Sequence, residues 1–283
     1  MKEVKDDWVS HQLHYSTGCQ AVDDYLKGGI ISGEITQVSG DEATGKTQFC
    51  HSFSTSVAQN GKKVVYIDTE STFNAERIVN IVKARQPKTN PRPVMELIRV
   101  VRIFTVPELF QVLHIFLEET DISALILDSI LGLLVPHFNR LEGSGFDQND
   151  EKDNNEFGRK TKKEMFGIVK ELVKLLATFR LKNPSLAIVV TNSKSEWFRK
   201  TWYNSISRCI VLSVKEMTRK VISKPLDVWP TLSSSSSTSS DSSMTLTVRQ
   251  LEVKKSIDFS IRDSFPALFP VVITDAGFQD FIP

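Results

Sequence analysis

The sequence lacks several features that would assign it to a special class of protein. No apolar run reaches the roughly 18 residues of a membrane-spanning helix, and the charged N-terminus has no apolar signal core. The 35 Lys and Arg residues are balanced by 34 Asp and Glu residues, so any nucleic-acid site must be a local patch. The three cysteines are odd in number and far apart, which indicates neither a disulfide framework nor a metal site. We therefore expect a soluble, intracellular protein.

The order of the predicted elements indicates an α/β fold. Short aliphatic segments alternate along the chain with segments of helical period. The predicted strands are 35–38, 64–67, 97–104, 124–127 and 186–190. The predicted helices are 47–58, 73–84, 165–180 and a segment ending at 117 that follows Thr105, whose spacing to Glu108 matches a capping box. This alternation predicts a mainly parallel, doubly wound sheet.

The chain changes character at both ends of this region. Residues 1–15 are polar and are expected to form a short N-terminal tail, with a single domain at 16–283. Beyond Arg208 the pattern becomes β-rich, which predicts a partly antiparallel C-terminal extension. Nine of the eleven residues in 233–243 are serine, which predicts a flexible loop at about 231–243 or a site of regulatory phosphorylation. Three prolines within 86–93 predict a loop there as well.

A phosphate-binding motif follows the first predicted strand. Residues 40–47 match G-x-x-x-x-G-K-[ST] at every fixed position, between a predicted strand and a predicted helix. In such a loop the backbone N–H groups point inward and the helix N-terminus favours an anion. Lys46 would reach the phosphates and Thr47 would bind Mg²⁺. The expected nucleotide-binding residues are Gly40, Asp41, Glu42, Ala43, Thr44, Gly45, Lys46 and Thr47.

Carboxylates end two further predicted strands. Asp128 ends a strongly apolar run, where it would contact Mg²⁺ or a water of its shell. Asp68 and Glu70 end the strand at 64–67, where a carboxylate would either orient a water for attack on a phosphate or cap the next helix.

The motifs occur in an ordered series that resembles the RecA-type recombinases, and more closely the eukaryotic recombinase paralogues. The series is Ser16-Thr17-Gly18, Asp23-Asp24-Tyr25-Leu26, Gly33-Glu34-Ile35-Thr36, Gly45-Lys46-Thr47-Gln48, Tyr66-Ile67-Asp68-Thr69-Glu70, Thr72-Phe73, Glu76-Arg77, Leu127-Asp128-Ser129 and Val189-Val190-Thr191-Asn192. The resemblance covers roughly residues 16–214. It implies a RecA-like P-loop ATPase core that binds ATP and Mg²⁺, contacts single-stranded DNA and assembles in filament-like complexes.

The resemblance also implies roles for individual residues. It places the water-orienting glutamate at Glu70, so that Glu70 and Lys46 are the expected catalytic residues. It adds Gln48 and Arg77 to the nucleotide-binding set, and it assigns Thr47 and Asp128 to the metal.

The chain departs from the recombinase pattern in three places. Only about 15 residues precede the core, without a Phe-x-x-Ala assembly motif. Ser193 stands where the recombinases have a glutamine, and the loop between Asn192 and Trp202 is short. These departures favour an accessory paralogue that works in a hetero-complex over one that forms filaments by itself.

Two segments are candidates for DNA contact. The first interleaves cations and aromatic rings, as single-strand binding requires; its expected DNA-binding residues are Lys194, Trp197, Arg199 and Lys200. Its aromatic residues could equally pack into the fold or a partner interface, and Trp202 is interpreted as a packing residue. The second candidate, 159–163, is basic, but it could be a solvated helix start or a nuclear-targeting patch. It follows an acidic block at 142–156 that would repel phosphate and serve a protein partner instead.

The sequence thus predicts an ATP-binding accessory protein of homologous recombination and double-strand-break repair. Such a protein would bind single-stranded DNA, assist recombinase filaments together with other paralogues in the nucleus, and hydrolyse ATP weakly in a DNA-dependent manner. One alternative is a nucleotide-stabilised structural subunit that does not hydrolyse ATP, and another is an autonomous strand-exchange recombinase. Retention of Lys46 and Glu70 favours the first hypothesis, whereas Ser193 favours the structural subunit.

Overall fold

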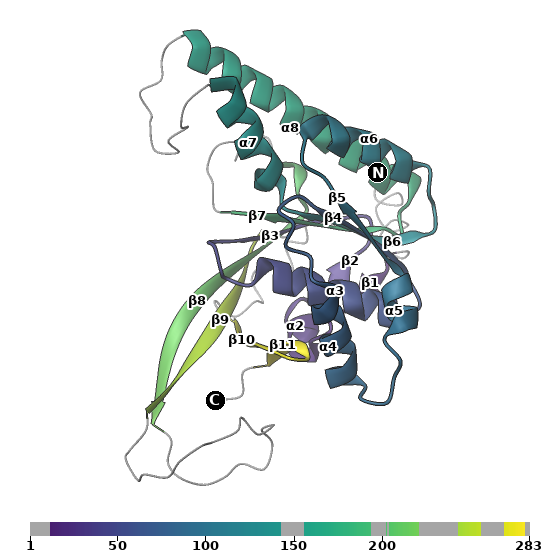
Figure 1. Ribbon diagram of the computed structural model, residues 1–283, viewed down its shortest axis with the longest axis vertical. Coiled ribbons are helices and arrows are strands. Elements are labelled where there is room, and N and C mark those ends of the chain that lie inside the picture. Colours follow the sequence, from purple (N-terminus) through teal and green to yellow (C-terminus); the bar gives the residue numbers. More distant parts are fainter. Residues whose placement is uncertain are drawn as a thin grey trace, which may run out of the picture.

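A nine-stranded sheet forms the centre of the protein (Figure 1). The computed structural model describes residues 12–142, 156–193, 202, 204–220, 243–255 and 269–280. In spatial order the strands are β11 (Gly277–Asp280), β10 (Phe269–Thr274), β9 (Ser243–Lys255), β8 (Arg208–Lys220), β3 (Ile35–Gly40), β7 (Ala187–Asn192), β6 (Ile122–Asp128), β4 (Lys63–Asp68) and β5 (Ile98–Arg102).

Two strand directions divide this sheet into a core and an extension. Neighbouring strands from β8 to β5 run parallel, whereas β8, β9, β10 and β11 pair antiparallel. The prediction of a mainly parallel α/β sheet with a β-rich C-terminal extension is confirmed. The carboxyl ends of β3, β4, β6 and β7 lie at the same edge of the sheet, which is where ligands bind in open α/β folds.

Helices cover both faces of the sheet (Figure 1). One layer contains α2 (Gln20–Tyr25), α3 (Lys46–Gln59), α4 (Ala75–Arg85) and α5 (Arg92–Glu96), and the other contains α6 (Val106–Leu117), α7 (Ile130–Glu142) and α8 (Glu156–Lys182). Along β4, Val64 and Tyr66 pack with the first layer, and Val65 and Ile67 pack with the second. Apolar residues occupy successive positions of β4 because this strand is buried on both faces.

Several elements differ from the sequence prediction. The helix α5 begins at Arg92, inside the segment expected to be a loop, and a proline is tolerated in its first turn because the N–H groups there have no helical partner. Strand β1 (His14–Tyr15) pairs with β2 (Ile30–Ile31), so the last residues of the segment 1–15 form part of a two-stranded sheet. In contrast, the capping box predicted at Thr105 is confirmed.

The serine-rich loop expected at about 231–243 lies outside the described residues except for its last residue. Of the helices in the described part of the chain, none combines the length and the apolar character needed to cross a bilayer.

Candidate nucleotide-binding site

The loop between β3 and α3 has a backbone that its glycines make possible. Gly45 has φ 103°, in the left-handed region, and it directly precedes the helix. A Cβ atom at Gly40 would lie 2.6 Å from the carbonyl oxygen of Leu212 and 2.5 Å from Thr44 Oγ1, so that only glycine fits. The Nζ atom of Lys46 donates hydrogen bonds to the carbonyl oxygens of Gly40 (3.0 Å) and Asp41 (2.8 Å). The ammonium group of Lys46 is therefore held against carbonyl oxygens of the same loop.

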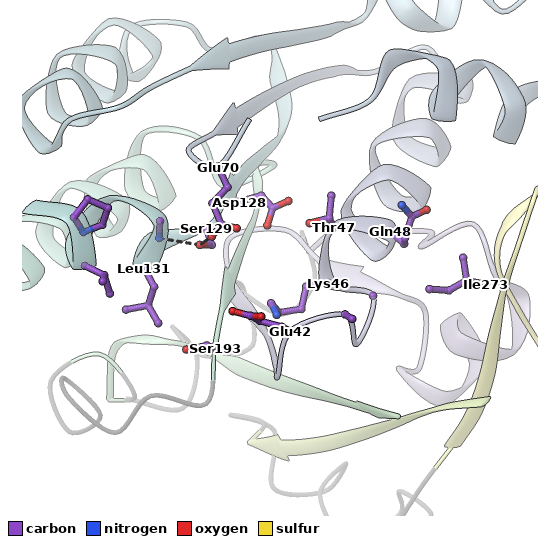
Figure 2. Close-up of a pocket in the computed structure, with 15 residues that line it drawn as sticks. Glu42, Lys46, Thr47, Gln48, Glu70, Asp128, Ser129, Leu131, Ser193 and Ile273 are labelled. Carbon is purple, nitrogen blue, oxygen red and sulfur yellow. Dashed lines mark hydrogen bonds between the residues drawn. The ribbon is translucent and has the colours of Figure 1, made fainter. Parts of the chain in front are cut away.

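A cavity of about 600 Å³ lies over this loop (Figure 2). Its walls come from the loop, from the ends of β4, β6 and β7, from α7 and from β10. The lining residues are Glu42, Ala43, Gly45, Lys46, Thr47, Gln48, Glu70, Asp128, Ser129, Leu131, Gly132, Val135, Pro136, Ser193 and Ile273. Because α3 starts here, its free N–H groups and its dipole favour an anion in the cavity. Gly40, Asp41 and Thr44 shape the loop without lining the cavity.

Asp128 and Thr47 place oxygen atoms at one side of the cavity (Figure 2). Asp128 is buried, with Oδ2 accepting a hydrogen bond from the Tyr66 hydroxyl at 2.7 Å and Oδ1 accepting one from Thr191 Oγ1. Within the described part of the chain, no cluster of three or more His, Cys, Asp or Glu residues is available to hold a metal ion. Carboxylate and hydroxyl oxygens fit Mg²⁺, which takes few protein ligands and completes its shell with phosphate and water.

The two carboxylates after β4 have different environments. Glu70 lines the cavity. Asp68 is fully buried; its oxygens accept hydrogen bonds from the backbone N–H groups of Thr72 and Phe73, both at 3.1 Å, and it lies 3.6 Å from Arg102 Nε. Asp68 thus stabilises the turn that leads to α4, whereas Glu70 is the one of these two carboxylates that lines the cavity.

Arg77, which the resemblance adds to the nucleotide-binding set, is not among the residues that line the cavity. Its Nε donates to Gln48 Oε1 at 2.8 Å, and its terminal nitrogens donate to the carbonyl oxygens of Thr274 and Asp275. Arg85 donates in the same way to the carbonyl oxygen of Ala276 at 3.0 Å. Two arginines of α4 therefore hold the turn between β10 and β11 against the helical layer.

The turn between β10 and β11 also affects the cavity. It keeps β10 in place, and Ile273 of that strand forms part of the cavity wall. No local motif marks Ile273, because only the order of strands in the sheet brings it near the loop. The α7 residues Leu131, Gly132, Val135 and Pro136 also line the cavity, because α7 begins directly after Asp128 at the end of β6.

An uncharged histidine lies beneath the site, on α3. Burial lowers the pKa of His51 to about 4; the positive charge of Arg77 acts in the same direction, and Asp128 and Asp68 oppose it. The imidazole stacks on Tyr66, with ring centroids 5.9 Å apart, and packs edge-on against Phe73 at 5.2 Å. His51 is therefore a neutral packing residue between the helix of the phosphate loop and the segment that follows Glu70.

Comparison with known proteins supports the ordered series of motifs. The Rad51 family profile matches residues 9–196, which is more than half of the chain. The chain belongs to the Rad51 family. It is similar to the "Meiotic recombination protein DMC1 homolog" of Arabidopsis thaliana, with 39% identity over 127 residues that cover 42% of this chain and 36% of that protein.

A second curated relative and a solved structure are also similar to this chain. The "DNA repair protein RAD51 homolog 2" of Homo sapiens is 34% identical over 144 residues, which cover 46% of this chain and 38% of that protein. The chain thus matches little more than a third of the length of either relative. The crystal structure of the RadB recombinase has the same fold, with a TM-score of 0.60 over 95% of this chain and 100% of that chain at 18% identity.

The candidate DNA-binding residues are not placed by the structure. Lys194, Trp197, Arg199 and Lys200 lie outside the described residues, as does nearly all of the acidic block at 142–156. The interpretation of Trp202 as a packing residue is confirmed: its side chain is 2% exposed, and its Nε1 donates to Gln37 Oε1.

Proposed function

We propose that this Rad51-family chain is an ATP-binding accessory protein of homologous recombination and double-strand-break repair. It binds ATP with Mg²⁺, hydrolyses it weakly, contacts single-stranded DNA and assists or remodels recombinase filaments in a complex with other paralogues in the nucleus. The observation that carries the proposal is the cavity, in which Lys46, Thr47, Glu70 and Asp128 meet at the N-terminus of α3.

Each of these residues has a role that follows from its place. The phosphates of ATP occupy the N-terminus of α3, where Lys46 exchanges its loop carbonyls for phosphate oxygens. Thr47 and Asp128 would hold Mg²⁺, which would supply positive charge next to the phosphates. Glu70 orients the attacking water. Glu42, Gln48 and Ile273 complete the nucleotide's surroundings.

Two features support an accessory role over autonomous strand exchange. Ser193 lines the cavity at the position where the resemblance to recombinases puts a glutamine. A serine is too short to link the phosphates to a distant DNA loop. The buried Trp202 limits the length of the loop that follows Ser193, because the chain must return to the core at Trp202. The cations Lys194, Arg199 and Lys200 give this loop a small single-strand site whose affinity falls steeply with salt.

Ser193 also favours the second candidate function, a nucleotide-stabilised structural subunit without turnover. The two functions share the cavity and differ in what Glu70 does. ATP hydrolysis by the purified chain, with and without single-stranded DNA and with and without a recombinase, separates them. Stimulation by DNA supports the first function, and ATP binding without turnover in any mixture supports the second.

Lys46 provides the test of the cavity itself. Lys46→Ala removes charge-assisted hydrogen bonds to phosphate, so ATP should bind on the order of 10- to 100-fold more weakly. The exposed Lys62→Ala, which removes the same charge away from the cavity, is the matched control. Equal ATP affinity of the parent and the Lys46→Ala protein would contradict the assignment.

Glu70 provides the test of hydrolysis. A water-orienting group acts mainly in the transition state, so Glu70→Gln should lower kcat while ATP affinity stays near that of the parent. Equal turnover by the two proteins would remove Glu70 from the reaction. Sedimentation with ATP and single-stranded DNA tests assembly, because long filaments formed by this chain alone would restore the autonomous recombinase.

A further inference from the structure

The side chain of Ser129 makes two hydrogen bonds that link α7 to Glu70. Its Oγ accepts a hydrogen bond from the backbone N–H of Gly132 at 3.0 Å, in the geometry of a helix N-cap. Its hydroxyl proton is donated to Glu70 Oε1. Ser129 is buried and lies directly beside Glu70 at the cavity wall (Figure 2).

The backbone on both sides of this contact is fixed. The Oγ1 atom of Thr69 accepts from the backbone N–H of Ser129 at 2.8 Å and donates to its carbonyl oxygen at 2.7 Å. The backbone N–H of Thr69 donates to the carbonyl oxygen of Asp128 at 2.9 Å. The residue before Glu70 and the residue that starts α7 are therefore held in one place relative to each other.

Gly132 adds a steric restraint from the first turn of α7. A Cβ atom at this position would lie 2.6 Å from Glu70 Cγ and 3.0 Å from Glu70 Oε1. The stem of the Glu70 side chain thus rests against the helix backbone, where no larger residue fits. Within the described residues, no group donates a hydrogen bond to the other carboxylate oxygen, Oε2.

We propose that Ser129 is a positioning residue for Glu70, and that Gly132 provides the surface against which it is positioned. The inference rests on the proposed hydrolytic function. Glu70 is otherwise exposed, with several rotatable bonds, and the hydroxyl fixes one carboxylate oxygen so that the other is presented to the attacking water. Positioning matters because a displacement of about 1 Å at a reacting group can cost on the order of 100-fold in rate.

The test compares Ser129→Ala, Ser129→Thr and Gly132→Ala, each with Glu70 intact and each with Glu70→Ala. Three quantities are measured on the full chain: kcat for ATP with single-stranded DNA, the affinity for ADP, and the affinity for ADP–aluminium fluoride, which mimics the transition state. Ser129→Ala should lower kcat on the order of 10- to 100-fold. It should also weaken the preference for ADP–aluminium fluoride while the affinity for ADP stays within about twofold, since only the reacting geometry changes.

The variants then distinguish positioning from simple structural damage. Ser129→Thr keeps the hydroxyl and should restore most of kcat. Gly132→Ala should lower kcat, because the added Cβ would lie 2.6 Å from both Glu70 Cγ and Thr69 Oγ1 and would displace Glu70. In the Glu70→Ala background Ser129→Ala should have no further effect, because it acts through Glu70. The exposed Ser185→Ala is the matched control.

Four outcomes would overturn the proposal. Full kcat in Ser129→Ala would overturn the positioning role while leaving the hydrolytic function intact. An equal loss in the Glu70→Ala background, or a matching loss of ADP affinity, would make Ser129 a structural residue only. A parent chain that binds ATP but neither hydrolyses it nor prefers ADP–aluminium fluoride would remove the hydrolytic function, and the positioning role with it.

Discussion

The buried imidazole of His51 predicts a specific loss of stability in mild acid. The group has a pKa of about 4 in the folded protein, compared with 6.5 for the free side chain, chiefly because burial disfavours its charged form. Among the described residues, nothing hydrogen-bonds to its Nδ1. The unfolded chain therefore binds a proton more readily than the folded one as the pH falls.

The sign and size of the effect follow from these two values. The stability that neutral His51 contributes is fully present above pH 6.5 and is lost as the pH falls from 6.5 towards 4. Between pH 7 and pH 5 this single group should lower the free energy of unfolding by about 2 kcal/mol, and by about 3 kcal/mol once the pH is below 4. Other groups also titrate in this range, so the effect must be isolated by comparison.

Urea unfolding at pH 7 and pH 5, at constant ionic strength, provides the comparison. His51→Gln and His51→Phe remove the titration, so each variant should lose about 2 kcal/mol less than the parent between the two pH values, whatever its stability at pH 7. The exposed His114→Gln is the matched control and should follow the parent. If the His51 variants lose as much stability as the parent, His51 is not buried and neutral as the structure has it.

Three further substitutions test other parts of the fold by urea unfolding at pH 7. Thr105→Ala removes the cap of α6 and should cost about 1 kcal/mol, and an unchanged stability would contradict the capping box. Ser71 has φ 56°, so Ser71→Gly should stabilise the protein by up to about 1 kcal/mol, and a loss would mean that this backbone is not strained. Arg85→Met leaves the carbonyl oxygen of Ala276 without its hydrogen-bond donor and should cost about 2 kcal/mol. The exposed Lys83→Met is the control. Equal stability of the two variants would mean that Arg85 does not hold the β10–β11 turn.

Local chemistry explains what the sequence could predict of the fold and the site. A mainly parallel α/β sheet follows from buried strands that alternate with helices, and the phosphate loop is a contiguous motif. The capping box at Thr105 is also local, because both of its hydrogen bonds join residues three apart. Asp128 could be identified because the apolar run before it makes its strand evident.

What the sequence could not predict depends on contacts between distant segments. Asp68 and Glu70 lie two residues apart at the end of the same strand, and only the turn in which Asp68 accepts three backbone N–H groups separates their environments. Arg77 has the right charge to bind a phosphate, yet its guanidinium group donates hydrogen bonds to the carbonyl oxygens of Thr274 and Asp275 next to the β10–β11 turn. Ile273 enters the cavity through the order of strands, which periodicity does not encode.

The position of Ile273 in the cavity wall also bears on the order in which the site forms during synthesis. The phosphate loop emerges early from the ribosome, but β7 and β8, which flank β3 in the sheet, and β10, which carries Ile273, all follow much later in the chain. At roughly 5–20 residues per second, Ile273 is added on the order of ten seconds or more after Thr47. A nascent chain that ends before Phe269 therefore holds the whole phosphate loop but lacks the part of the cavity wall that Ile273 provides. The wall is completed late in synthesis, when β10 pairs with β9.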